Sequence, residues 1–171
     1  MARRSNQVHP LGNPGITMLI RTYTHWVVKK YNQGETVPFE VIEFDGNVLL
    51  NEGINALWTL LAGGIEDAFD NTNSYIGVGD GTAGESAGHV GLQGANKVYV
   101  GMQAAFPTYG ADQSITWQAV FGAGVGTFAW QEYTVANGNS DAATNLLRKV
   151  QSLGTKAAAS TWTLTVTRTL A

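Results

Sequence analysis

The chain has 171 residues, of which 44% are hydrophobic and only 13% are charged, and its formal net charge is −3 at pH 7. This length and apolar content predict one domain with a substantial core. The small negative charge gives no electrostatic basis for binding nucleic acid, and no apolar run is long enough for a membrane-spanning helix. The absence of cysteine excludes disulfides and thiolate metal sites. A surface so poor in charge favours contact with other protein.

Residues 1–17 are polar and are interrupted by two prolines and two glycines, which prevents a regular element. We expect an extended, flexible N-terminal arm here, followed by a single β domain over residues 18–171. The arm is either a frayed terminus or a segment that becomes ordered on a neighbouring subunit. In the second case Arg3 and Arg4 are candidate partner contacts, because they would meet an acidic patch.

The next two segments predict a β-hairpin. Residues 18–31 are rich in β-branched and aromatic side chains, which favours a strand. A turn at residues 32–35 leads to a second strand over residues 37–44, in which Pro38 indicates an edge position or a strand start.

A short helix is predicted for about residues 51–62. Apolar side chains recur with helical spacing at Ile54, Leu57, Trp58 and Leu61. Asn51 is a candidate N-cap, and Gly63 with Gly64 ends the helix. We expect this helix to close one end of a β structure, with Trp58 in the core.

Short strands fill most of the remaining chain. They are predicted at residues 75–82, 97–102, 114–121, 127–135, 146–153 and 161–170. Residues 146–153 also fit a short helix, although a strand is favoured, and residues 82–96 read as a long glycine-rich loop. The last strand alternates apolar residues with threonines, which suits a solvated or partner-facing surface. The fold class is therefore all-β, either a β-sandwich of jelly-roll-like form or a β-barrel.

The sequence carries no convincing constellation for catalysis or cofactor binding. The run Gly77–Thr82 has a misplaced third glycine for a dinucleotide loop and is followed by more loop, not by a helix. The three histidines have no spacing typical of a zinc site. We predict that the protein is not an enzyme and that it holds no cofactor or metal.

Four acidic residues in one region of the sequence are a candidate calcium site. It consists of Asp67, Asp70, Asp80 and Glu85. The regular spacing of a calcium loop is absent, so solvated carboxylates are the preferred interpretation.

Five tryptophans are many for this length. Trp117 and Trp162, like Trp58, lie on apolar faces of periodic segments and are predicted to be core residues. Trp26 and Trp130 are candidate partner contacts, because tryptophan is enriched at interfaces. Glu132, beside Trp130, is predicted at a sheet edge or subunit contact, or else facing water. A carbohydrate-binding module that stacks sugars on Trp26 or Trp130 is a further alternative.

A series of short motifs resembles a family of small structural proteins of tailed bacteriophages. The motifs occur in the order LLNEGINALWTLLAGG, YIGVGDGT, LQGANKVYVGMQAAFP, ITWQAVFG, FAWQEYTV, NLLRKV and STWTLTVTRTL. The resemblance covers residues 45–170 and leaves residues 1–44 outside. It implies a virion protein, either of the capsid decoration (cement) kind or associated with tail fibres, and it implies no catalytic residue.

From this resemblance, the low charge and the arm, we expect a capsid decoration protein on the outer surface of the virion head. Its partners would be the major capsid protein and copies of itself, most simply as a homotrimer. A tail or tail-fibre component is the alternative, although the repetitive shaft common in fibre proteins is absent.

Overall fold

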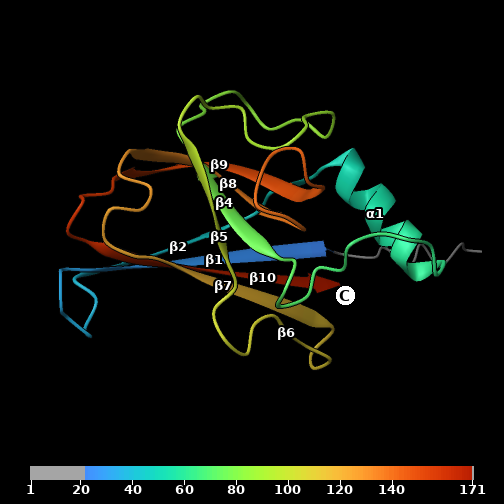
Figure 1. Ribbon diagram of the computed structural model, residues 1–171, viewed down its shortest axis with the longest axis horizontal. Coiled ribbons are helices and arrows are strands. Elements are labelled where there is room, and N and C mark those ends of the chain that lie inside the picture. The colour runs from blue at the N-terminus through green and yellow to red at the C-terminus, as the bar shows by residue number, and fades with distance from the viewer. Residues whose placement is uncertain (1–21, 171) are drawn as a thin grey trace, which may run out of the picture.

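The computed structural model describes residues 22–170, so the predicted arm at residues 1–17 lies outside the described range. Two five-stranded antiparallel sheets form the body of the protein (Figure 1). The first sheet has the order β2-β1-β10-β7-β6, with β2 (Glu40–Asp45), β1 (Thr22–Tyr31), β10 (Thr161–Leu170), β7 (Ser114–Phe121) and β6 (Thr108–Tyr109). The second has the order β3-β9-β8-β4-β5, with β3 (Val48–Leu49), β9 (Asn145–Thr155), β8 (Ala129–Ala136), β4 (Tyr75–Gly79) and β5 (Lys97–Gly101).

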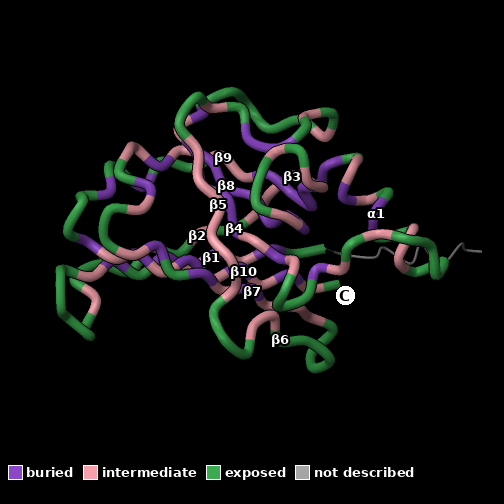
Figure 2. Tube along the Cα trace, viewed as in Figure 1, coloured by how far each residue is buried: buried purple, intermediate pink, exposed green. Residues whose placement is uncertain are grey.

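One hydrophobic core lies between the two sheets, and Figure 2 shows the buried residues concentrated there. Trp130 of β8 joins the layers, because its ring centroid lies 4.8 Å from that of Trp162 on β10 and 4.7 Å from that of Phe121 on β7. Trp117 and Trp162 are buried as predicted. The all-β prediction is confirmed, and the two separate sheets make the protein a β-sandwich.

Strand alternation accounts for most of these elements. The β1–β2 hairpin is confirmed, with Val28 opposite Ile42. Residues 145–155 form a strand, β9, which settles the choice left open for this segment. Thr22 pairs with Leu170 at one end of the sandwich, and Tyr31 pairs with Thr161 at the other. The β1–β2 turn therefore lies at the end opposite to the start of β1 (Figure 1).

Helix α1 (Asn51–Leu61) lies at one end of the sandwich, as expected (Figure 1). Its N-cap is Leu50, without a side-chain hydrogen bond, so the prediction that Asn51 caps the helix is wrong. The buried helix residues are Gly53 and Ala56. A Cβ atom at Gly53 would lie 2.5 Å from the Cα atom of Leu146 on β9, so the helix backbone touches the strand backbone.

This close approach turns the predicted apolar face outward. Leu57, Trp58 and Leu61 are exposed by 43%, 64% and 76%, so the prediction that Trp58 is a core residue is wrong. Small residues, which permit backbone contact, take the fully buried positions of the helix, and Leu60 packs against the core at its edge.

Candidate interaction surfaces

An ion pair is buried on the outer face of the second sheet. Glu132 of β8 and Arg148 of β9 are both fully buried. The Nε and Nη2 atoms of Arg148 lie 2.7 and 2.6 Å from Oε2 of Glu132. A buried ion pair of this kind persists only when further hydrogen bonds satisfy both groups.

The glycine-rich loop at residues 80–96 supplies those hydrogen bonds. The Glu132 carboxylate accepts from the backbone N–H groups of Gly81, Gln93 and Gly94 at 3.2, 2.9 and 2.6 Å. Arg148 donates to the carbonyl of Ala83 at 2.9 Å. The loop therefore covers the sheet, and the converging N–H groups are occupied by the protein's own carboxylate. The prediction that Glu132 is a partner contact is wrong, because the loop excludes partners from it.

Two more carboxylates hold the same loop. Asp141 accepts from the backbone N–H of Leu92 at 3.0 Å and contacts Lys97 and Tyr99. Burial alone would raise the pKa of Asp141, but its hydrogen bonds with Lys97 and Tyr99 hold the pKa below its ordinary value. Glu52 of α1 accepts from Gly91 at 3.2 Å, and burial raises its pKa.

Three of the four acidic residues considered for calcium accept hydrogen bonds within the protein, and the fourth, Asp67, is exposed. Asp80 accepts hydrogen bonds from Asn96, and Asp70 accepts from the backbone of its own turn. Glu85 accepts from the backbone N–H of Val150. Within residues 22–170, no group of three or more histidine, aspartate or glutamate side chains is arranged to hold a metal ion.

The remaining predicted contacts do not form a surface. Trp26 and Trp130 are fully buried, and their indole N–H groups donate to the carbonyls of Gly46 and Gly126, each at 2.9 Å. Their assignment as partner contacts is wrong, and neither ring is available for a sugar to stack on. Arg3 and Arg4 lie outside the described residues.

A partly exposed surface without charged side chains lies on the outer face of the first sheet, where β7 and β10 meet, next to His25 and Lys29 of β1. We call it the threonine face, and it consists of Thr163, Thr165, Thr167 and Thr169 of β10 with Thr116, Gln118 and Val120 of β7. Side chains on the two strands are hydrogen-bonded, Thr116 to Thr167 at 2.9 Å and Gln118 to Thr165 at 2.8 Å. The face is therefore both rigid and rich in hydrogen-bonding groups.

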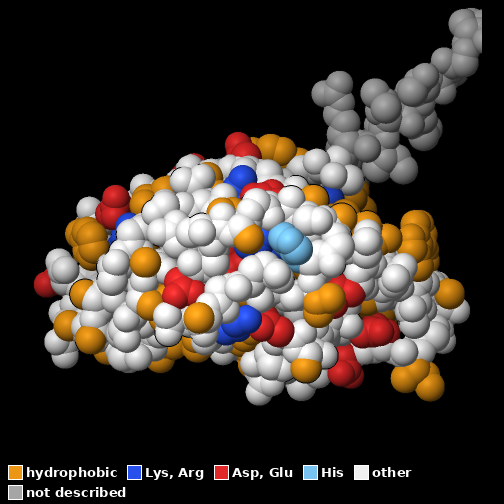
Figure 3. Space-filling view, turned by 90° about the horizontal axis from the view of Figure 1, so that it is seen from above, with side chains coloured by type: hydrophobic (Ala, Val, Ile, Leu, Met, Phe, Trp, Pro, Cys, Tyr) orange, Lys and Arg blue, Asp and Glu red, His pale blue; other side chains and the backbone are white. Residues whose placement is uncertain are grey.

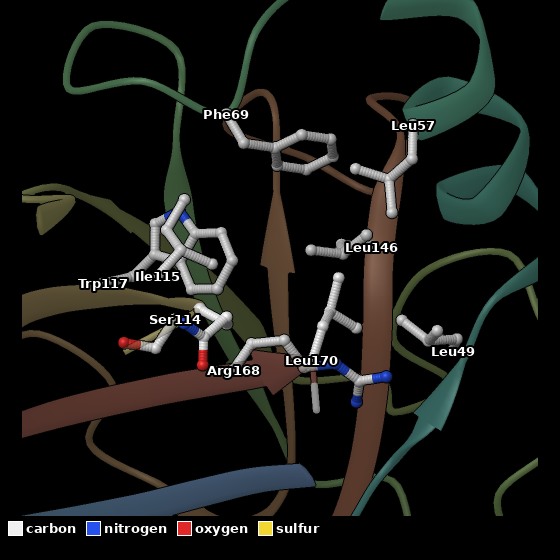
Figure 4. Close-up of a pocket in the computed structure, with 10 residues that line it drawn as sticks. Leu49, Leu57, Phe69, Ser114, Ile115, Trp117, Leu146, Arg168 and Leu170 are labelled. Carbon is white, nitrogen blue, oxygen red and sulfur yellow. The ribbon is translucent and has the colours of Figure 1, made fainter. Parts of the chain in front are cut away.

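A second surface is apolar and lies at the α1 end. We call it the α1 patch, and it consists of Leu57, Trp58, Leu61 and Ile65. Beside it a cavity of about 280 Å³ opens between the ends of the two sheets. Figure 4 shows its lining, which includes Leu49, Leu57, Phe69, Ile115, Leu146 and Leu170. The sequence analysis did not predict this patch. The signal was available, because the small residues Gly53 and Ala56, three positions apart, mark the side of the helix that approaches the sheet.

Comparison with known proteins found no match: no family model, no curated protein and no solved structure is similar to the chain. Among the described residues, no helix has the length and apolar character needed to cross a membrane.

Proposed function

We propose that this chain is a non-enzymatic virion structural protein, and specifically a capsid decoration protein. It binds and stabilises the shell formed by the major capsid protein, as a homotrimer on the outer surface of the capsid. The observation that carries the proposal is the threonine face, because a rigid surface of two strands without charged side chains suits contact with other protein. The motifs over residues 45–170, which resemble those of phage structural proteins, support the same conclusion.

The two sheets differ in a way that favours the threonine face as the contact. The outer face of the second sheet is closed around Glu132 and Arg148, which are fully buried under the glycine-rich loop. The threonines of β10 remain half-exposed. Their hydroxyls offer hydrogen bonds without the large desolvation cost of charged groups.

The mechanism of stabilisation is added interfacial burial. Each contact across neighbouring capsid subunits removes apolar area from water, at about 25 cal/mol per Å², less the cost of ordering the interface. Repetition of a modest contact around a trimer multiplies the effect through effective concentration.

A charge placed in the threonine face tests the proposal. Val120 is 36% exposed in this face, opposite Thr163, and Val120→Lys adds a charge without removing a side-chain hydrogen bond. Ser152→Lys is the matched control, because Ser152 is exposed on the second sheet. In a sedimentation assay with capsids that lack the protein, we expect Val120→Lys to weaken binding at least tenfold and Ser152→Lys to leave it unchanged.

Gold-labelled antibody on intact virions tests the location separately. Label distributed over the head supports decoration. Label confined to the tail or its tip would replace this proposal with the tail-associated alternative.

The lysine variants have their own contradicting outcome. Equal capsid binding by Val120→Lys and Ser152→Lys would show that the threonine face is not the surface that contacts the capsid.

A further inference from the structure

We propose that residues 1–21 of this chain fold back onto the α1 patch of the same molecule, with their apolar part entering the cavity beside it. This inference is independent of the proposed function. It rests on the exposure of the patch, on the point where the segment joins the sandwich, and on complementary composition and charge.

The patch gathers four of the twelve exposed large hydrophobic side chains of residues 22–170 within α1 and the four residues that follow it. Ile65 is fully exposed next to Trp58 and Leu61, which are exposed by more than 60%. Of the five tryptophans, Trp58 alone is exposed. A group of exposed apolar side chains of this kind marks a site of interaction.

The first described residue lies at the rim of the cavity. Thr22 is paired with Leu170, and Leu170 lines the cavity together with Leu57 of the patch. The preceding segment therefore starts beside the apolar surface that it would cover. Twenty-one residues span at most about 70 Å when extended, which is ample for this docking. Covalent connection also gives the segment a millimolar effective concentration at the patch.

The segment has the composition that the patch requires. Its apolar residues are concentrated at Ile16, Met18, Leu19 and Ile20, immediately before β1. It contains no acidic residue and three arginines, Arg3, Arg4 and Arg21, whereas the chain from residue 22 onward has seven basic and thirteen acidic residues. A segment of charge +3 thus precedes a body of charge −6.

The charge around the patch is acidic. Asp67 and Asp70 are exposed in the loop that follows Ile65, and α1 has no basic residue in its last turn. The C-terminal end of a helix also carries partial negative charge. Figure 3 shows hydrophobic and acidic side chains together at this end of the molecule, on the right. Arg3 and Arg4 fit this acidic rim.

The cavity sets the direction of docking. Arg168 lines it and donates to Thr24 at 2.7 Å and Asn47 at 2.9 Å. This buried guanidinium disfavours a second cation nearby. The residues from Ile16 to Ile20 therefore occupy the cavity side, and Arg3 and Arg4 lie toward the C-terminal end of α1.

Acrylamide quenching of Trp58 fluorescence tests the inference in the full-length chain. The emission of the variant Trp58→Phe, subtracted from that of the unmodified chain, isolates the signal of Trp58. The double variant Ile16→Asp/Leu19→Asp places charges in the docking segment, and Gln7→Asp/Asn13→Asp adds the same charge at polar positions as a control. Circular dichroism verifies that every variant keeps its strand content.

We expect the quenching constant of Trp58 to rise at least threefold in Ile16→Asp/Leu19→Asp and to rise much less in the control, which changes the charge of the segment equally but leaves its apolar residues in place. A smaller rise is expected for Arg3→Ser/Arg4→Ser. If Trp58 is already as accessible in the unmodified chain as in the double variant, the inference is wrong. Protection that disappears on dilution, together with a fall from oligomer to monomer mass, would also overturn it by identifying a second copy as the occupant.

Discussion

Gly81 and Gly94 lie where the loop backbone meets the Glu132 carboxylate, with no space for a side chain. A Cβ atom at Gly81 would lie 2.6 Å from the backbone nitrogen of Gly94 and would also meet the carboxylate. Gly84 belongs to the same loop, yet a Cβ atom there would have no neighbour within 4 Å. These glycines differ in function although the sequence presents them alike.

We therefore expect Gly81→Ala to lower the free energy of unfolding by about 2 kcal/mol, because the loop must move away from the buried ion pair. Gly84→Ala should change it by less than about 1 kcal/mol. Urea denaturation measures both values, and hydrogen exchange of the loop amides should quicken in Gly81→Ala alone. Equal effects of the two substitutions would contradict the close packing described for Gly81.

The carboxylate of Asp141 gives a pH dependence of known sign. Its pKa is lower in the folded protein than in the unfolded chain, so the folded state favours the ionised form. This contribution to stability is complete above the unfolded pKa of about 3.9 and is lost as the pH falls through the lower folded pKa.

Asp141→Asn should therefore destabilise the protein at pH 6 and reduce the further loss of stability below about pH 4. Urea denaturation at a series of pH values measures this slope. Asp112→Asn is the control, because Asp112 is exposed and forms no ion pair with any described residue. A slope in Asp141→Asn as steep as that of the unmodified chain would show that other groups govern the acid response.

At the scale of elements, α1 depends on one backbone contact with β9. A methyl group at Gly53 would meet the Cα and carbonyl oxygen of Leu146, both 2.5 Å away, and a backbone cannot yield as a flexible side chain does. Gly53→Ala should raise intrinsic helix propensity and still destabilise the protein.

We expect a loss of about 1 to 3 kcal/mol for Gly53→Ala and a small gain for Asn55→Ala, which is exposed on the same helix. Thermal unfolding followed by circular dichroism distinguishes the two. An increase in stability with both alanines would mean that propensity outweighs the contact with β9.

The strands and the helix show which sequence patterns are sufficient to predict secondary structure and which are not. Strict alternation predicted β7 and β10 and the inward direction of Trp117 and Trp162, because a strand exposes its two faces at a period of two. Periodicity also located α1 within one residue of its end. It did not identify the buried face of the helix, because the small residues that permit backbone contact carry no hydrophobic signal.

The environments of Trp130 and Glu132 could not be predicted from the sequence, because they depend on tertiary contacts. A register irregularity between Trp130 and Glu132 directs the tryptophan into the core and the glutamate onto the outer face, although the two are only two residues apart. The loop that buries Glu132 starts about fifty residues earlier in the chain. One signal in the sequence indicated a buried ion pair: Glu132 and Arg148 are opposite charges in neighbouring apolar strands.

At the scale of the whole molecule, the shared core makes the two sheets one thermodynamic unit. Trp130 contacts Phe121 and Trp162 across the layers, and Tyr133 of β8 lies 5.9 Å from Trp26 of β1 between ring centroids. Both sheets contribute residues to this core, so unfolding of one sheet would expose the apolar face of the other.

We expect tryptophan fluorescence and far-ultraviolet circular dichroism to report one coincident unfolding transition in urea. The buried tryptophans report the core and circular dichroism reports the strands, so agreement between them tests the sharing of the core. Two separated midpoints would show that the sheets unfold independently.

The turn between β1 and β2 lies at the end opposite to α1. Gly34, within this turn, has a positive φ of 79° and open space around its Cα atom, and its neighbours are exposed. Exposed turns of this kind accept insertions most readily. A foreign peptide inserted at Gly34 would project away from the α1 patch, so the turn offers a position for displaying an antigen or enzyme on this protein.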